Sequence, residues 1–365
     1  MALVVVAPSQ AQRPLRVGIA FDVGGKNDRS FNQAVATGAT WAQEQLGIQI
    51  IEFEPTEAAA METGVEDLAQ AETDLVVGVG FGLEPAITEA AETYPDTRFA
   101  VIDAESPNGE NVASLIFEEQ EGAFLVGYIA GSLTQTGVVG FVGGMDIPLI
   151  HRFEVGYRAG VEYACTAASF DCEVLIDYVG TTPAAWNQPL QAQAIARNHL
   201  SQGADIIFAA AGGSGLGVID QILDTHCLQP HALPANVNFI RDPFATLPKP
   251  EDYTQNCPEG ARPVFFIGVD ANQNYLGDSD QDPLTLNYGL TSMLKRVDVA
   301  TLEIIEAVQA NEFQGGIHRF SLANDGVGYA LDEYNRSLLP PTLLTEVETL
   351  KQEIRTGTIT VPSSR

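Results

Sequence analysis

The feature that most restricts the fold of this chain is a repeated alternation of short apolar runs with amphipathic stretches, beginning at Arg16. The first five runs are 17–21, 48–53, 75–80, 99–103 and 112–117, and each ends in or next to Gly, Asp or Glu. Helix-like segments at 31–46, 58–71 and 85–94 lie between them. Apolar runs separated by helices predict a parallel sheet covered on both faces, in an α/β domain of about 120 residues.

The same pattern begins again in the second half of the chain. A long helix is expected over 118–134, and further helix-like segments are 153–164, 189–201 and 216–224. The new apolar runs are 138–142, 174–179, 206–211 and 264–269. We therefore predict an α/β protein of two lobes, each a parallel sheet flanked by helices, with a cleft between them. Residues 226–262, rich in proline, interrupt this rhythm and are interpreted as a surface insertion.

The charge of the chain excludes some classes of partner. It has 48 acidic and 18 basic residues, a formal net charge of −30. Such an acidic surface repels phosphate backbones and anionic lipids, so we expect no nucleic-acid partner and no binding to a membrane surface. The longest apolar run, residues 2–8, is too short for a transmembrane helix.

Residues 1–12 are interpreted as the remnant of a secretion signal or as a disordered tail. Ser9 and Ala11 follow the apolar stretch at the spacing that a signal peptidase accepts, although the usual basic segment is missing. We expect an exported protein, periplasmic or extracellular. No cysteine lies near this junction, so no lipid anchor is expected by this route.

The four cysteines, Cys165, Cys172, Cys227 and Cys257, allow three disulfide pairings. The pairings local in sequence are Cys165 with Cys172 and Cys227 with Cys257. Zinc binding is the competing reading, but it favours tight C-x-x-C pairs that the chain lacks. A catalytic cysteine would want a paired histidine. We therefore favour two disulfides formed in an oxidising compartment.

Ligands of open α/β sheets bind beyond the carboxyl ends of the strands, so the residues that follow each run are the candidates for a site. The first such segment, 22–32, holds Asp22, Asn27, Asp28, Phe31 and Asn32, together with one of only four lysines. A turn and helix cap would explain part of this set. We favour ligand contact, because a cap alone does not need so many charged, amide and aromatic side chains.

Later strand ends add further candidates. Trp186 lies in the loop after 174–179, where a ring can stack on a flat ligand. Asp270 ends the run 264–269 and can accept hydrogen bonds from paired ligand donors. Lys295 follows, and an ion pair with Asp270 is the structural alternative for both residues. The glycine-rich segments 78–82 and 212–217 do not fit the G-x-G-x-x-G pattern of nucleotide sites.

No combination of nucleophile and base stands out, and there is no H-E-x-x-H or H-x-x-x-H pattern. We therefore expect neither catalytic residues nor a metal or cofactor, and interpret the chain as a binding protein. The alternatives are a binding protein for another flat, flavin-like ligand or for a sugar, an enzyme such as a nucleoside hydrolase or a dehydrogenase, and a cytoplasmic ligand-sensing regulator.

The segment DVGGKNDRSFNQ at 22–33 resembles the opening motif of the basic membrane protein family, the purine nucleoside receptor-like substrate-binding proteins of ABC transporters. The resemblance continues through the segments FEEQEGAFLVG at 117–127, GFVGGM at 140–145, AGGSG at 211–215, IGVD at 267–270 and TSMLK at 291–295. It covers nearly the whole chain after residue 12. Trp186 stands where the family often has Phe, and the insertion 226–262 is not part of the family pattern.

This resemblance implies a type I periplasmic-binding-protein fold with three hinge crossings. The first lobe would be 13–133 with 293–314 and the second 137–290 with 316–335, leaving 336–365 as a tail. It implies a purine nucleoside held between the lobes and an ABC permease as partner, and we expect a monomer. The ligand-binding residues that it implies are Asp22, Asn27, Asp28, Phe31, Asn32, Trp186, Gly213, Asp270 and Lys295.

Overall fold

A computed structural model describes residues 13–365, so the expected leader at 1–12 lies outside the described residues. The first of two six-stranded sheets consists of β1 (Arg16–Ala20), β2 (Gln49–Phe53), β3 (Leu75–Gly78), β4 (Arg98–Ile102), β5 (Val112–Phe117) and β13 (Gly316–Phe320). Its strand order is β13-β5-β4-β3-β1-β2, and all neighbours are parallel. Val76 and Val77 are both fully buried and belong to different core clusters, as expected for a sheet covered on both faces.

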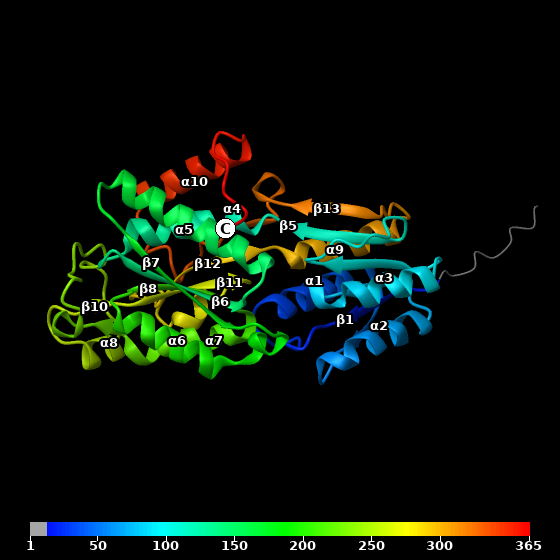
Figure 1. Ribbon diagram of the computed structural model, residues 1–365, viewed down its shortest axis with the longest axis horizontal. Coiled ribbons are helices and arrows are strands. Elements are labelled where there is room, and N and C mark those ends of the chain that lie inside the picture. Colours follow the sequence, from blue (N-terminus) through cyan, green and yellow to red (C-terminus); the bar gives the residue numbers. More distant parts are fainter. Residues whose placement is uncertain (1–12) are drawn as a thin grey trace, which may run out of the picture.

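The second sheet consists of β6 (Val138–Met145), β7 (Glu173–Gly180), β8 (Ile206–Ala210), β11 (Phe265–Asp270), β12 (Gly289–Lys295) and β14 (Val327–Tyr329). Its order is β14-β12-β11-β8-β6-β7, and only the edge strand β14 runs antiparallel. The two sheets lie in separate lobes along the long axis of the molecule (Figure 1). This arrangement confirms the predicted α/β fold.

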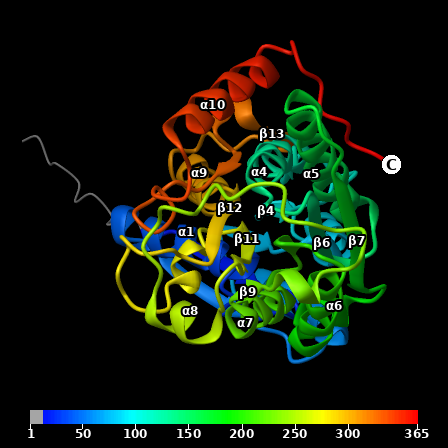
Figure 2. The same cartoon turned by 90° about the vertical axis from the view of Figure 1, so that its left-hand side faces the viewer.

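Helices cover both sheets. Those of the first lobe are α1 (Phe31–Leu46), α2 (Met61–Gln70), α3 (Glu84–Thr93) and α9 (Val297–Gln309). Those of the second are α4 (Glu119–Leu133), α5 (Pro148–Ala167), α6 (Pro189–Ser201), α7 (Gly215–Thr225), α8 (Glu251–Asn256) and α10 (Pro341–Arg355). Within the lobes α1 packs on α9, α4 on α5, and α6 on α7. Viewed from the end of the second lobe, α10 lies on the side opposite to α7 and α8 (Figure 2).

Helices α4 and α5 approach each other unusually closely. A Cβ atom on Gly127 would collide with the backbone carbonyl of Tyr157, and one on Gly160 with that of Phe124. Glycine at these positions lets the two helix backbones touch.

The chain passes between the two sheets three times, after β5, after β12 and after β13. These crossings differ from the expected lobe limits in two places. Helix α4 packs on α5 and β14 of the second lobe, so the first crossing lies near Glu118 rather than after residue 133. Strand β13 pairs with β5 of the first sheet, although 316–335 was expected in the second lobe. Helix packing decides the first difference and hydrogen bonding between distant strands the second, and local sequence patterns encode neither.

Two disulfides close loops in the second lobe, Cys165–Cys172 and Cys227–Cys257, as expected from their spacing. The second closes the insertion, whose ends form a short antiparallel pair, β9 (Cys227–Leu228) with β10 (Arg262–Pro263). Within the insertion, Arg241 donates hydrogen bonds to the carbonyls of Gly131 and Thr134, the carboxyl end of α4. The insertion is thereby fastened to a helix that reaches the hinge.

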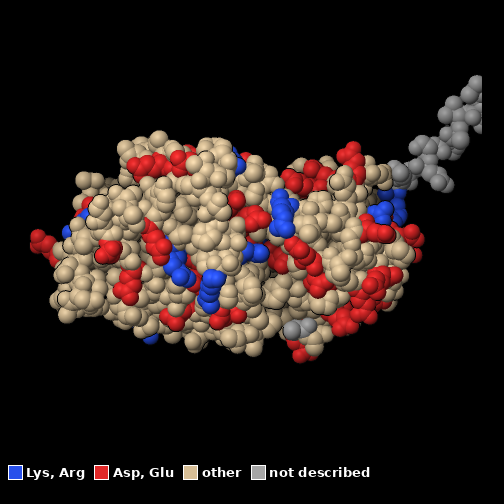
Figure 3. All heavy atoms as spheres, turned by 45° about the horizontal axis from the view of Figure 1, so that its top comes forward, with Lys and Arg blue, Asp and Glu red and all other residues tan. Residues whose placement is uncertain are grey.

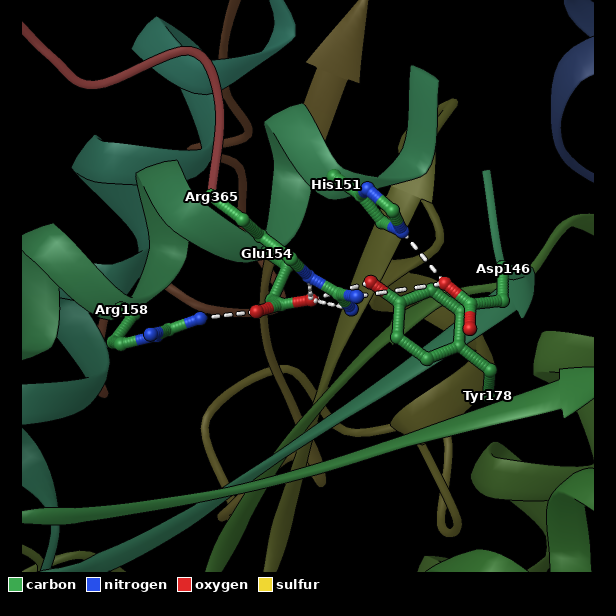
Figure 4. A network of polar contacts seen from close by, with 6 residues as sticks. All are labelled: Asp146, His151, Glu154, Arg158, Tyr178 and Arg365. Carbon is green, nitrogen blue, oxygen red and sulfur yellow. Dashed lines mark hydrogen bonds and ion pairs between the residues drawn. The ribbon is translucent and has the colours of Figure 1, made fainter. Parts of the chain in front are cut away.

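The tail after α10 ends against the second lobe. Arg365 donates to the carboxylate of Glu154 in α5, and its guanidinium stacks over the ring of Tyr178 on β7 at 5.2 Å (Figure 4). The Tyr178 hydroxyl donates to the same carboxylate, and His151 bonds with Asp146 beside it (Figure 4). The network holds the first turns of α5 against β7.

Acidic side chains far outnumber basic ones on the face drawn in Figure 3, so the negative charge lies largely at the surface. None of the helices in 13–365 has the length and the apolar stretch that crossing a membrane requires.

Candidate functional site

A cavity lies between the lobes, at the carboxyl ends of the strands; the space not filled by atoms measures about 590 Å³, open solvent at its mouth included. The cavity is lined by all but one of the predicted residues: Asp22, Asp28, Phe31, Asn32, Trp186, Gly213, Asp270 and Lys295. The exception is Asn27, whose side chain is exposed outside it. The two lobes thus bring together residues that are up to 273 positions apart, from 22 to 295.

Asp28 explains why Asn27 points away. Its carboxylate accepts hydrogen bonds from the backbone N–H groups of Ser30, Asn32 and Gln33, at 2.9–3.0 Å. These groups begin α1 and have no partners within the helix, so Asp28 caps the helix from inside the cavity. With Asp28 turned inward, the preceding side chain faces solvent. Lys26 is also directed outward and pairs with Glu52.

Asp22 lies directly beyond β1 and is held by its neighbours. One of its carboxylate oxygens accepts from the backbone N–H of Gly24 at 2.8 Å and from the side-chain amide of Asn32 at 2.7 Å. Burial outweighs these bonds and raises the pKa of Asp22 to about 6. Asn32 therefore serves both to bridge Asp22 to Asp28 and to line the cavity.

Aromatic rings line the cavity from both lobes. Phe31, the first residue of α1, and Phe81 come from the first lobe, and Phe153 of α5 and Trp186 from the second. Phe81 and Phe153 were not among the predicted site residues. Phe81 follows β3 within the segment 78–82, so the rule of strand ends could have found it. Phe153 reaches the cavity from a helix, and only the packing of α5 places it there.

Lys295 ends β12 and lies at the second crossing. Its ammonium nitrogen is 2.6 Å from the Asp103 carboxylate and 3.0 Å from that of Glu119. Asp103 and Glu119 are therefore the ion-pair partners of Lys295. Asp270, the partner considered from the sequence, forms no direct ion pair with it. Arg152 of α5 approaches the other oxygen of Glu119 at 2.7 Å. Two carboxylates and two cations thus meet where the lobes join.

This ion cluster is buried. Lys295 is 2% exposed and Glu119 fully buried. Burial alone would lower the pKa of Lys295, but the carboxylates of Asp103 and Glu119 more than offset it, so that pKa lies above its ordinary value. Burial raises the pKa of Glu119. The ammonium group also lies 5.1–5.7 Å from the ring centres of Phe31, Phe117 and Phe153.

Asp270 joins the two lobes. It accepts a hydrogen bond of 2.7 Å from the hydroxyl of Ser30, which precedes α1 in the first lobe. Nearby, the side-chain amide of Gln273 donates to the carbonyl of Arg29 at 2.8 Å. These two bonds cross the cleft, so the lobes are in contact in this conformation. Burial raises the pKa of Asp270 to about 7.

Asp103 is the site carboxylate that sequence reasoning missed. It directly follows β4 as Asp270 ends β11, and both have a left-handed backbone, with φ of 69° and 62°. Aspartate tolerates this conformation better than most residues, and such backbone positions are common at functional sites. The shared signal in the sequence is an aspartate at the end of a buried parallel strand.

We expect the raised pKa of Asp270 to make the free protein less stable as the pH rises. The folded protein keeps a proton at this carboxyl that the unfolded chain releases above about pH 4. The stability conferred by that proton is complete below about pH 4 and is lost as the pH approaches 7. The unfolding free energy of the wild type minus that of Asp270→Asn should therefore fall between pH 4 and 7 and then stay level.

Urea unfolding of the wild type and of Asp270→Asn at a series of pH values measures this difference in unfolding free energy. The same difference in unfolding free energy, taken with Asp22→Asn, should also fall with pH. Its fall should end about one pH unit lower, because the pKa of Asp22 is about 6. A difference that increases with pH would show that the site carboxyls are ionised throughout.

The charge of the cavity sets what it can hold. Asp22, Asp28, Asp103 and Asp270 line it, whereas Lys295 is the one cationic lining residue in the part of the chain that the structure describes. A carboxylate accepts hydrogen bonds but repels anions, so the wall suits hydroxyl and N–H donors rather than phosphates. No histidine or cysteine is found among the lining residues within 13–365.

Comparisons with known proteins place the chain in context. A family model described as "ABC transporter substrate-binding protein PnrA-like" matches residues 16–226. The CD4+ T-cell-stimulating antigen of Listeria monocytogenes is 31% identical, with 97% of this chain and 89% of that protein covered. The ABC transporter nucleoside-binding protein BmpA of Lactococcus lactis is 30% identical, with 96% and 89% covered.

The same likeness extends to three dimensions. The crystal structure of an ABC transporter solute-binding protein from Aeropyrum pernix superposes with a TM-score of 0.77 at 29% identity, covering 96% of this chain and 94% of that one.

Proposed function

Because this chain belongs to the Bmp family of ABC transporter substrate-binding proteins, we propose that it captures a purine nucleoside outside the cytoplasm and delivers it to an ABC importer. The observation that carries the proposal is the composition of the cavity wall, in which aromatic rings from both lobes accompany four carboxylates. A relative that is named as nucleoside-binding supports it.

The base and the ribose of a nucleoside each find suitable groups in the cavity wall. A purine base has two flat faces, on which Phe31 of the first lobe and Trp186 of the second can stack. Its ribose carries hydroxyl donors, for which the carboxylates Asp22, Asp103 and Asp270 are acceptors. A ligand that engages both lobes would add to the hydrogen bonds that already cross the cleft.

The excess of carboxylates favours the nucleoside over its phosphate esters. A 5′-phosphate would bring about two negative charges into a wall whose ionised groups are mostly carboxylates. Lys295 cannot neutralise them, because Asp103 and Glu119 already occupy its ammonium group. Both walls come from one chain, so a monomer suffices for binding.

Isothermal titration of the full chain tests the proposal. We expect inosine, guanosine or adenosine to bind at one site per chain, and inosine 5′-monophosphate and free ribose to bind far more weakly. Chromatography of the mixture should return the nucleoside intact. Release of free base at a catalytic rate would identify an enzyme, and tighter binding of a flavin or a sugar than of every nucleoside would contradict the ligand class.

We expect Phe31→Ala to weaken nucleoside binding by about 1–3 kcal/mol, the scale of base–aromatic stacking. Phe31 is half-buried and lines the cavity, so folding should change little. Phe313→Ala is the matched control, because Phe313 is also half-buried but stacks with Arg98 away from the cavity. Titration calorimetry measures both variants. Unchanged affinity in Phe31→Ala, or loss of folding, would assign Phe31 to the core.

A further inference from the structure

The indole ring of Trp186 lies directly over the backbone of β6. A Cβ atom built on Gly144 would come within 2.6 Å of Cε3 and 3.1 Å of Cη2 of that ring, and closer still to Cζ3. Separations below about 3.0 Å essentially do not occur for real Cβ atoms. Gly144 does not line the cavity, whereas Trp186 does. The ring therefore occupies space that any other residue at 144 would claim.

The backbone around Trp186 is fixed independently. The buried hydroxyl of Ser214 donates to the carbonyl of Ala185 at 2.7 Å and accepts from the N–H of Gln188 at 2.6 Å. These bonds hold the short helical turn Pro183–Asn187 on both sides of the tryptophan. A collision at the ring cannot be relieved by shifting this turn without breaking them, so the side chain itself must rotate.

We propose that Gly144 is a positioning residue, whose missing side chain sets where the Trp186 ring stands in the cavity and thereby how tightly the second lobe grips a flat ligand. The effect on the ligand rests on the proposed function, but the position of the ring does not. Glycine is required at position 144 only as long as a large ring stands at position 186.

Fluorescence tests the ring directly. The chain has two tryptophans, so Trp41→Phe leaves Trp186 as the only one and serves as the reference protein. Adding Gly144→Ala should shift the emission of Trp186 and change its quenching by acrylamide in the absence of ligand. Gly180→Ala is the matched control at the neighbouring strand end, because its Cβ would meet only Ala185, at an ordinary 3.4 Å. This control should leave the emission unchanged.

Binding of inosine tests the consequence. Gly144→Ala should weaken it about tenfold, within the range that loss of one stacking ring produces. Trp186→Phe, which replaces the indole by a smaller ring, should remove most of that loss when the two substitutions are combined. If Gly144→Ala prevents folding, the combination with Trp186→Phe should restore it for the same steric reason.

Three results would overturn the proposal: unchanged Trp186 emission in Gly144→Ala, an equal loss of affinity with Trp or Phe at 186, or a double variant that fails to fold. If the reference protein binds no nucleoside, the proposed ligand is wrong. The emission and folding measurements then still decide whether Gly144 positions the ring.

Discussion

Lys295→Met is expected to lower the free energy of unfolding by about 3–5 kcal/mol, the usual cost of removing one partner from a buried ion pair. Methionine is of similar length and is apolar, so it fills the space but leaves Asp103 without a cationic partner and Glu119 with Arg152 alone. The Glu119 side chain is fully buried and that of Asp103 is only 6% exposed, so an uncompensated charge on either is costly. Urea unfolding at constant pH measures the loss.

Two further variants make this result specific. Lys351→Met removes a lysine that pairs with the largely exposed Asp325 at the surface, and it should cost at most about 1 kcal/mol. Adding Asp103→Asn to Lys295→Met removes the unpaired carboxylate and should recover part of the stability. A loss below about 1 kcal/mol in Lys295→Met would show that the cluster contributes little to folding.

Replacing Cys227 and Cys257 together by alanine is expected to cost about 3–4 kcal/mol of stability. Their disulfide spans 30 residues, and a cross-link restricts the unfolded chain more as its loop lengthens. The same double change at Cys165 and Cys172, which are 7 residues apart, should cost only about 2 kcal/mol. Denaturant unfolding of the oxidised protein and the two variants gives the comparison.

Neither disulfide lines the cavity, so we expect inosine affinity to be unchanged in both variants at a temperature where they are folded. Loss of binding in the Cys227 variant without loss of stability would contradict this expectation. It would mean that the insertion acts on the cleft through Arg241, which holds the carboxyl end of α4.

Much of the fold could be predicted because the sequence patterns that indicate its helices and strands are local. The expected helix over 31–46 coincides with α1, and the apolar runs of both halves became the central strands. Strands β12 and β13 were not predicted as strands. The assignment of β13 to the first sheet depends on hydrogen bonds with β5, about 200 positions earlier in the chain.

The candidate site, like the fold, could be predicted only in part from the sequence. The rule that ligands bind at the carboxyl ends of parallel strands led to Asp22, Trp186 and Asp270, which the structure gathers at one cavity. It did not distinguish Asn27 from Asp28, although one is exposed and the other buried. That difference follows from the amides of α1, which need an acceptor on the inner side of the turn.

The sequence by itself determined the α/β class, the two lobes and the strand ends at which a ligand can bind, because hydrophobic periodicity and turn residues act over short stretches of chain. Only the tertiary structure decided that Lys295 pairs with Asp103 and Glu119 rather than with Asp270, and that Gly144 underlies Trp186. Ion pairs and steric contacts depend on distances of a few ångströms between segments far apart in sequence. Those distances are set only when both lobes have folded and the crossings between them hold the lobes together.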